Sequence, residues 1–241
     1  MKVVAILPAA GLGTRMTKGS GGGRKQFFQL GGVPILVRTI RKFVAVDRVS
    51  EILVAVRPED VDSVRQMIEE AAFAKPVRVV EGGNARQHSV QNALAQVPAD
   101  ADLVAVHDAV RPFIEVETIN HVLDEAAGSG AAIVGVVPVD TVKQVAPKQS
   151  NRARIKGTIP REGLVLAQTP QVFRLDLIRR AFKTASDDRF IGTDESSLVE
   201  RLEEVEVIVV PGSDRNIKIT KPADLDLARL YLSEEEEEPV A

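Results

Sequence analysis

The segment that decides the fold is Val3-Val4-Ala5-Ile6-Leu7-Pro8-Ala9-Ala10-Gly11-Leu12-Gly13-Thr14-Arg15-Met16. Its first five residues form a continuous apolar run, which is typical of a strand buried on both faces. The small residues that follow let a backbone approach a ligand closely. Gly11 and Gly13 can also take the positive φ that turns successive N–H groups towards an anion. A strand leading into such a turn predicts an α/β sheet with a ligand site at the carboxyl end of the strand.

The rest of the chain continues this pattern. Besides Val3–Leu7, short apolar runs predict strands at Ile52–Val56, Val77–Val80, Leu103–Val106, Ala132–Val137 and Val205–Val210. Amphipathic patterns between them predict helices at Ile35–Val44, Val61–Ala72, Arg86–Val97, Thr118–Ala127, Leu175–Thr184 and Ala223–Leu232. This alternation predicts a Rossmann-like, mostly parallel sheet with helices on both faces.

Residues 139–161 break the rhythm, because they alternate polar and apolar residues around the turn-forming stretch 147–151. This predicts a β-hairpin. Val142, Val145 and Ile155 have little core to join, so we expect an arm that projects from the domain and packs on a second subunit, giving a homodimer. A surface hairpin packed on its own domain is the alternative. We therefore expect one domain over residues 1–232 with an arm at about 139–161, followed by a disordered acidic tail over 233–241.

Composition excludes several classes of function. The 241 residues include no cysteine, which rules out disulfides and thiolate chemistry. Five of the 34 acidic residues form the run Glu234–Glu238, and without them the charge balance is 31 − 29 = +2, so there is no basic footprint for nucleic acid. No apolar run approaches the roughly 18 residues of a membrane helix, and Val3–Leu7 is too short for a signal peptide. We expect a cytoplasmic protein that binds neither nucleic acid nor membrane.

The first loop does not fit the two common nucleotide motifs. Met16 stands where a dinucleotide fingerprint requires glycine, and Gly23-Arg24-Lys25-Gln26 lacks the Ser or Thr of a P-loop. A Gly-x-Gly alone would also suit an ordinary tight turn with an exposed Arg15.

The full string Ala-Ala-Gly-x-Gly-x-Arg-Met, followed by Lys25-Gln26, resembles the sugar-phosphate nucleotidyltransferases. Within them it is similar to the 2-C-methyl-D-erythritol 4-phosphate cytidylyltransferases of the non-mevalonate isoprenoid pathway, over roughly residues 3–232. The resemblance implies transfer of CMP from CTP to the polyol phosphate with release of pyrophosphate, and Mg²⁺ as cofactor. It also implies that Arg15 and Lys25 hold the triphosphate and stabilise charge at the α-phosphorus.

Two other functions stay open. Ribitol 5-phosphate cytidylyltransferases are close relatives, although Val106-His107-Asp108-Ala109 favours methylerythritol phosphate. A nucleotide-binding regulator without catalysis is the other alternative, against which the presence of both Arg15 and Lys25 argues.

The loop before Lys25 departs from the family. It carries Gly19-Ser20-Gly21-Gly22-Gly23, and Arg24 takes the place of a frequent proline. Ordering this many flexible residues costs a large conformational entropy. We therefore expect the loop to be a lid that is poorly ordered without CTP.

Two motifs follow the third and fourth strands. Gly82, Gly83, Arg86 and Ser89 match the family's Gly-Gly-x-x-Arg-x-x-Ser, which by resemblance reads cytosine and ribose, while Asn84 would suit the N-cap of the next helix. Asp108 is the best-placed carboxylate for Mg²⁺, directly or through water. We interpret His107 as a packed structural residue and discount a catalytic triad, because neighbours on a strand point to opposite faces.

The resemblance assigns the site residues as follows. The CTP-binding set is Pro8, Ala9, Ala10, Gly11, Gly13, Thr14, Gly83, Asn84, Arg86, Ser89, Asp108, Ala109 and Arg111. The phosphate of the second substrate is held by Thr141, Arg161, Thr169, Thr193 and Lys218. The catalytic set is Arg15, Lys25, Arg161 and Lys218. Because Thr141 and Arg161 flank the arm, we expect them to serve the neighbouring subunit's site. A phosphate monoester is largely ionised at neutral pH, so no general base is required.

Overall fold

The computed structural model describes residues 1–11, 24–146 and 152–237. Its centre is a seven-stranded sheet in the order β11-β7-β10-β6-β1-β4-β5. The strands are β1 (Val3–Pro8), β4 (Val49–Val56), β5 (Val77–Glu81), β6 (Leu103–Val106), β7 (Ala131–Val136), β10 (Leu166–Arg174) and β11 (Ile208–Pro211). β10 pairs antiparallel with both of its neighbours, and the other pairs are parallel. The predicted mostly parallel sheet is confirmed.

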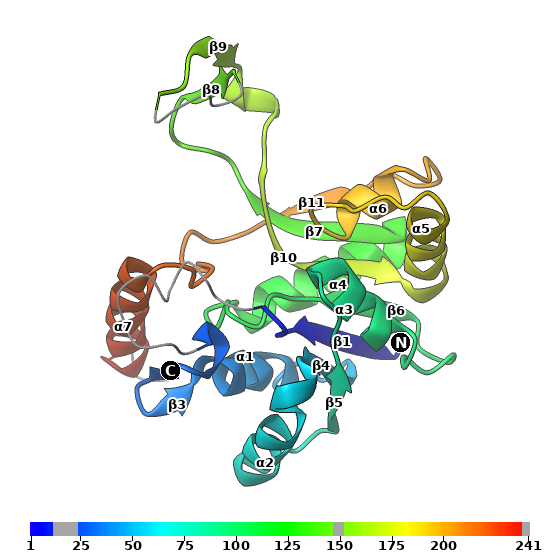
Figure 1. Cartoon of the computed structure of the whole chain (residues 1–241), viewed down its shortest axis with the longest axis vertical. Coiled ribbons are helices and arrows are strands. Elements are labelled where there is room, and N and C mark those ends of the chain that lie inside the picture. The colour runs from blue at the N-terminus through cyan, green and yellow to red at the C-terminus, as the bar shows by residue number, and fades with distance from the viewer. Residues whose placement is uncertain (12–23, 147–151, 238–241) are drawn as a thin grey trace.

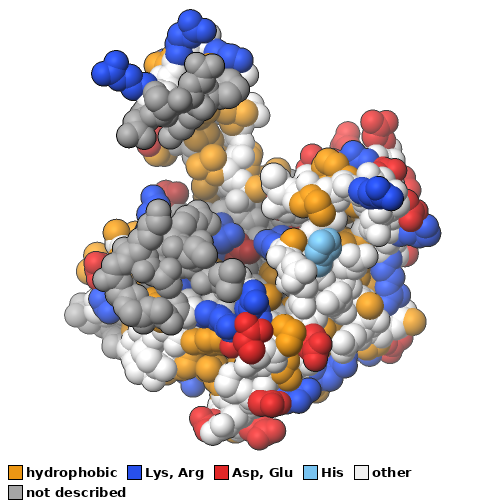
Figure 2. Space-filling view, in the orientation of Figure 1, with side chains coloured by type: hydrophobic (Ala, Val, Ile, Leu, Met, Phe, Trp, Pro, Cys, Tyr) orange, Lys and Arg blue, Asp and Glu red, His pale blue; other side chains and the backbone are white. Residues whose placement is uncertain are grey.

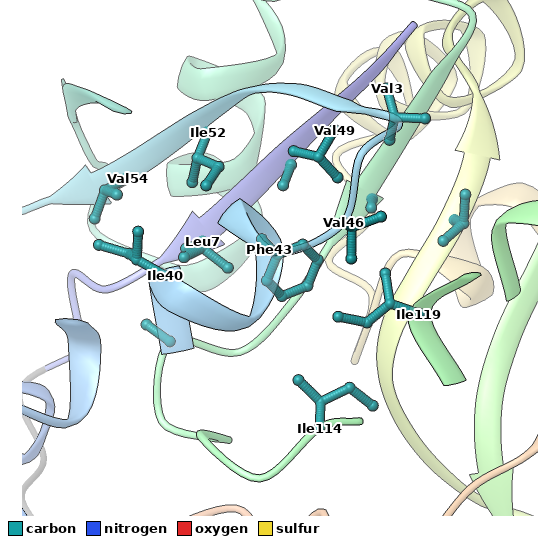
Figure 3. Close-up of a cluster of buried hydrophobic side chains, with 14 of the residues drawn as sticks. Val3, Leu7, Ile40, Phe43, Val46, Val49, Ile52, Val54, Ile114 and Ile119 are labelled. Carbon is teal, nitrogen blue, oxygen red and sulfur yellow. The ribbon is translucent and has the colours of Figure 1, made fainter. Parts of the chain in front are cut away.

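Helices cover both faces of the sheet, because successive residues of a buried strand point to opposite sides. Val3, Ala5 and Leu7 of β1 pack in one core cluster with α1 (Ile35–Val44), α2 (Val61–Ala71) and α4 (Val116–Ser129). Figure 3 shows part of this cluster, in which Phe43 lies among Leu7, Val46 and Ile119. Val4 and Ile6 pack on the other side with α3 (Arg86–Leu94), α5 (Leu175–Asp187) and α6 (Ser196–Glu200). All six predicted strands and all six predicted helices are present, with bounds that differ by a few residues.

The predicted arm is a hairpin of β8 (Val142–Val145) and β9 (Ile155–Ile159), which stands away from the body (Figure 1). The chain leaves the sheet after β7 and returns into β10, and these strands are neighbours that pair Val136 with Leu166. Val145 and Ile155, which pair across the hairpin, are 47% and 60% exposed in the described part of the chain. The arm also carries exposed basic side chains, seen near its tip in Figure 2.

The carboxyl-terminal helix differs from expectation. α7 (Pro222–Glu237) continues through residues assigned to a disordered tail, which was predicted to start at 233. Glu234 pairs with Arg215 at 2.6 Å and Glu235 with Lys42 at 3.3 Å, so the acidic run is partly neutralised by cations of the body. Residues 238–241 lie outside the described part of the chain.

Two shorter elements complete the fold beneath α7. Leu30 of β2 (Gln29–Leu30), which pairs with β3 (Val33–Pro34), packs with Phe113, Ile219 and Leu232 in a third apolar cluster. Within the described ranges, no helix is long and apolar enough to cross a membrane.

Candidate active site

The carboxyl ends of β1, β4, β5 and β6 surround a cavity of about 360 Å³. It is lined by Pro8, Ala9, Ala10, Gly11, Lys25, Gln26, Arg57, Gly83, Asn84, Ala85, Arg86, Ser89, Asp108, Ala109, Val110, Lys218 and Thr220. Charged side chains of both signs gather in the hollow at the centre of the body in Figure 2. Every predicted CTP-binding residue that the structure describes lines this cavity except Arg111, which hydrogen-bonds to the cavity residue Asp108. Gly13, Thr14, Arg15 and the predicted lid Gly19–Gly23 lie outside the described residues.

The turn after β1 is held from both sides. The Ala9 N–H donates to the carbonyl oxygen of Ala55 in β4 at 2.7 Å, and the buried Gln26 amide donates to the carbonyl oxygen of Ala9 at 2.6 Å. Gln26 belongs to the short 3₁₀ turn Lys25–Phe27. The two residues of the Lys-Gln pair therefore have different roles. Gln26 anchors the segment to the first turn, and its neighbour Lys25 reaches the cavity.

Arg57, which the sequence analysis missed, adds a cation to the cavity. It follows β4 directly, and its Nε donates to Oε1 of Glu59 at 2.6 Å. The same oxygen accepts a hydrogen bond from Nη2 of Arg24 at 2.8 Å, and Arg24 also pairs with Asp60. Glu59 thus links the residue before Lys25 to the segment after β4. The only signal in the sequence was that Arg57 directly follows a predicted strand.

Close packing shapes the segment after β5. The Gly82 N–H donates to the Val56 carbonyl oxygen at 2.6 Å, and a Cβ at Gly82 would meet the Cβ of Ala10. The Gly83 N–H donates to the Ser89 hydroxyl at 3.1 Å. These contacts bring the turn after β5 against the turn after β1.

The alternative in which Asn84 serves as the N-cap of α3 is not what the structure shows. Ala85 has the extended backbone of an N-cap (φ −127°, ψ 161°) and the helix begins at Arg86, with no side-chain cap. Asn84 therefore lies one residue too early to reach the first free N–H groups, and it lines the cavity instead.

Asp108 is the electrostatic centre of the cavity. Its Oδ1 pairs with Nε of Arg86 at 3.2 Å, and its Oδ2 lies 2.9 Å from Nζ of Lys218 and 3.4 Å from Nε of Arg111. Burial would raise the pKa of this carboxyl, but the positive charges of Arg86, Lys218 and Arg111 outweigh it and hold the pKa well below its usual range. Asp108 is therefore ionised at any pH at which the protein would work.

Behind Arg86 lies Glu195, a second residue to which the sequence alone assigns no role. Its side chain is buried, and its Oε1 accepts from Nη1 of Arg86 at 2.6 Å. Burial is the main influence on this group and raises the pKa of the Glu195 carboxyl. Arg86 therefore bridges two carboxylates.

His107 is a packed structural residue, as expected. It is fully buried against Phe43, with ring centroids 5.0 Å apart. Its Nε2 lies 3.0 Å from the Arg111 carbonyl oxygen, which can only accept, and its Nδ1 lies 3.1 Å from the Thr169 hydroxyl, which in turn accepts from the Asp108 N–H. A neutral imidazole ring allows every hydrogen bond of this network to form. Burial lowers the pKa of His107 to about 4. Both ring nitrogens are occupied, so His107 is not a general base.

The residues predicted to hold the second phosphate do not meet within one chain. Lys218 lines the cavity, and Thr169 lies buried behind Asp108. Thr193 is exposed and does not line the cavity. Thr141 and Arg161 are exposed on the arm, where the Arg161 guanidinium donates to the carbonyl oxygen of Val139.

A doubly wound sheet whose strand ends surround a cavity with several cations defines a nucleotide-binding α/β protein. The sequence model of the family "2-C-methyl-D-erythritol 4-phosphate cytidylyltransferase" matches residues 3–234. The chain belongs to this family of nucleotidyltransferase enzymes, which confirms the resemblance seen in the sequence.

Individual relatives agree over nearly the full length. Proteins named 2-C-methyl-D-erythritol 4-phosphate cytidylyltransferase share 61% identity in Solibacter usitatus, covering 98% of this chain and 97% of that one, and 54% in Acidobacterium capsulatum, covering 96% and 98%. The crystal structure of the 4-diphosphocytidyl-2C-methyl-D-erythritol synthase from Anaerococcus prevotii superposes with a TM-score of 0.83 at 29% identity, covering 96% of each chain. A cytidylyltransferase structure from Thermus thermophilus gives a TM-score of 0.73 at 32% identity, covering 97% of this chain and 100% of that one.

Proposed function

We propose that this chain transfers CMP from CTP to 2-C-methyl-D-erythritol 4-phosphate, releasing pyrophosphate and 4-diphosphocytidyl-2-C-methyl-D-erythritol. The observation that carries the proposal is the placement of Lys25, Arg57 and Lys218 around one cavity at the strand ends, in a chain that matches this family over residues 3–234. Fixed cations at that place suit a triphosphate and the charge that builds at its α-phosphorus.

The attacking group needs no base. A phosphate monoester has its second pKa near 6 and carries its own nucleophilic oxygen at neutral pH. His107, the neighbour of Asp108 in the chain, is buried and neutral. The protein's task is therefore to hold the monoester oxygen in line with the departing pyrophosphate, with Lys25 and, by resemblance, Arg15 on the triphosphate.

Mg²⁺ is the proposed cofactor, and Asp108 is its proposed protein ligand. Among the described residues there is no cluster of three acidic or histidine side chains, so a metal would have to share a single carboxylate with phosphate oxygens. This is the usual way in which Mg²⁺ is bound at triphosphate sites. Bound there, the ion would offset charge on the phosphate oxygens.

A homodimer through the arm is also proposed. The exposed Val145 and Ile155 offer apolar area, and an arm placed across a neighbour could bring Thr141 and Arg161 to the neighbour's cavity. We place the enzyme in the cytoplasm, because CTP is available there.

A pyrophosphate-release assay tests the proposal. The enzyme is offered four nucleoside triphosphates with methylerythritol phosphate and with ribitol 5-phosphate, and the product is identified by mass. We expect turnover with CTP and methylerythritol phosphate. Preferred turnover of ribitol 5-phosphate would assign the chain to the alternative activity. CTP binding without pyrophosphate release from any acceptor would assign it to the non-catalytic alternative.

A further inference from the structure

Glu195 is a buried carboxylate that the proposed chemistry leaves without a role. Its side chain is 2% exposed, and its Oε1 binds Nη1 of Arg86 at 2.6 Å. Its Oε2 is buried and has no hydrogen-bond partner in the described part of the chain. An ionisable side chain held in this way loses hydration that one ion pair rarely repays, so its presence calls for an explanation beyond stability.

The backbone around Glu195 has anchors that do not involve its side chain. The N–H groups of Glu195 and Ser196 both donate to Oε1 of Gln171, at 3.1 and 3.0 Å. Asp194 accepts from the Ser197 N–H at 3.1 Å and from the Gln171 amide at 2.7 Å. The backbone of the loop is therefore fixed by Gln171 and Asp194, and the Glu195 carboxylate is directed at Arg86 alone.

The way in which Arg86 meets its two carboxylates is informative. Arg86 touches Asp108 with Nε only, on Oδ1. Its Nη1, on the side of the guanidinium away from the Nε–Nη2 edge, is held by Glu195, and this contact fixes the orientation of the group. Oδ2 of Asp108 is left for Lys218 at 2.9 Å and Arg111 at 3.4 Å. An unrestrained guanidinium commonly binds a carboxylate with two parallel N–H groups, one on each oxygen. Arg86 in that arrangement would compete with Lys218 for Oδ2.

We propose that Glu195 is a positioning residue: by holding Nη1 it fixes the orientation of the Arg86 guanidinium, so that Arg86 meets Asp108 on Oδ1 alone and leaves Oδ2 to Lys218 at the cavity. This rests on the proposed function, in which Lys218 and Asp108 serve nucleotidyl transfer. Glu195 touches no substrate and acts only through Arg86.

The test compares Glu195→Gln with the wild type and with Glu204→Gln. The control removes an equally short ion pair, 2.6 Å to Arg180, from an exposed site away from the cavity. We expect Glu195→Gln to lower kcat about 10-fold, because a displaced Lys218 would lose part of the stabilisation that a positioned cation gives the transition state. CTP affinity measured by calorimetry stays equal or becomes tighter, because one negative charge behind the cavity wall has been removed, and the melting temperature does not fall. Glu204→Gln should match the wild type in kcat, CTP affinity and melting temperature.

A double-mutant cycle makes the test specific to the guanidinium. A lysine at position 86 cannot form a two-pronged contact, so Glu195→Gln should change kcat less than about 3-fold in an Arg86→Lys background. An equal effect in both backgrounds would overturn the proposal. So would a lower melting temperature together with weaker CTP binding, since that is the result of a purely structural role.

A crystal structure of Glu195→Gln gives a reading that does not require turnover. Two guanidinium nitrogens of Arg86 on Asp108 would support the inference, and an unmoved Arg86 would contradict it. The wild-type enzyme in the pyrophosphate assay separately decides the proposed function, so failure of one is distinguishable from failure of the other.

Discussion

The Lys218 ammonium lies 2.9 Å from Oδ2 of Asp108, which ties the segment between β11 and α7 to the carboxyl end of β6. The contact holds a cation at the wall of the cavity. A charge fixed in this way before the reaction requires little reorganisation when charge develops on the phosphate.

We therefore expect Lys218→Ala to lower kcat by about 10²-fold in the pyrophosphate-release assay. The exposed Lys221 is a matched control on the same segment, and Lys221→Ala should retain wild-type turnover. If both variants turn over equally, Lys218 contributes no more than a surface charge.

Lys25→Ala should also lower turnover by about 10²-fold or more, because Lys25 reaches the cavity from the segment that Gln26 anchors. By resemblance, we expect the same of Arg15→Ala. Lys183→Ala, on the exposed face of α5, serves as the control. Wild-type rates in both Lys25→Ala and Arg15→Ala would remove the assignment of the first loop.

Arg57→Ala should act mainly on nucleotide binding. The side chain is already oriented by Glu59 and adds one charge-assisted contact, so its loss should raise the KM for CTP about 10-fold with little change in kcat. Arg65→Ala on the exposed face of α2 should leave the KM unchanged. Steady-state kinetics with varied CTP separate these outcomes, and a fall in kcat at unchanged KM would instead place Arg57 in the chemical step.

His107 should make folding stability depend on pH. Burial depresses its pKa to about 4 in the folded state, against 6.5 for the free side chain, so the unfolded chain binds more protons between these values. Stability from this group is fully present above pH 6.5 and is lost as the pH falls to about 4, by about 3 kcal/mol in total. Urea unfolding at several pH values measures the slope.

The His107→Gln variant should be less stable than the wild type at pH 7. Between pH 6.5 and 4, its free energy of unfolding should depend less steeply on pH, because it lacks the contribution of His107. His121→Gln, at an exposed helical position, should keep the wild-type slope. An unchanged slope in His107→Gln would show that other groups cause the dependence.

Arg161→Ala should raise the KM for the polyol phosphate and leave CTP affinity unchanged. Since Arg161 lies on the arm and not in its own chain's cavity, the shared-site proposal makes a second prediction. Mixing Lys25→Ala and Arg161→Ala subunits should restore activity, to about a quarter of the wild-type level for random dimers with independent sites. No recovery after verified subunit exchange would mean that Arg161 does not serve a neighbour's site.

The parallel strands could be predicted from sequence because each is a short apolar run, and β1, β4, β6 and β7 are buried on both faces. β10 could not be, because Gln168, Thr169, Pro170 and Gln171 interrupt its apolar residues. Those polar side chains are used in the sheet's interior: Thr169 binds His107 and the Asp108 N–H, and Gln171 fixes the loop at Glu195.

The site shows the same limit. The turns after the predicted strands placed Gly11, Gly83 and Asp108 together, because strand ends meet at one edge of a parallel sheet. Glu195 gave no such signal, since its partner Arg86 is distant in sequence and only the tertiary fold brings them together. The helical start of the acidic run was missed for the same reason, because its partners Arg215 and Lys42 come from other parts of the chain.

The pairing of Val136 with Leu166 makes the arm an excursion between two residues that are already side by side. Everything between them could grow, shrink or be exchanged for a short loop without altering the order of the strands. The proposed contribution of the arm to assembly could therefore evolve, or be engineered, separately from the nucleotide cavity of the same chain.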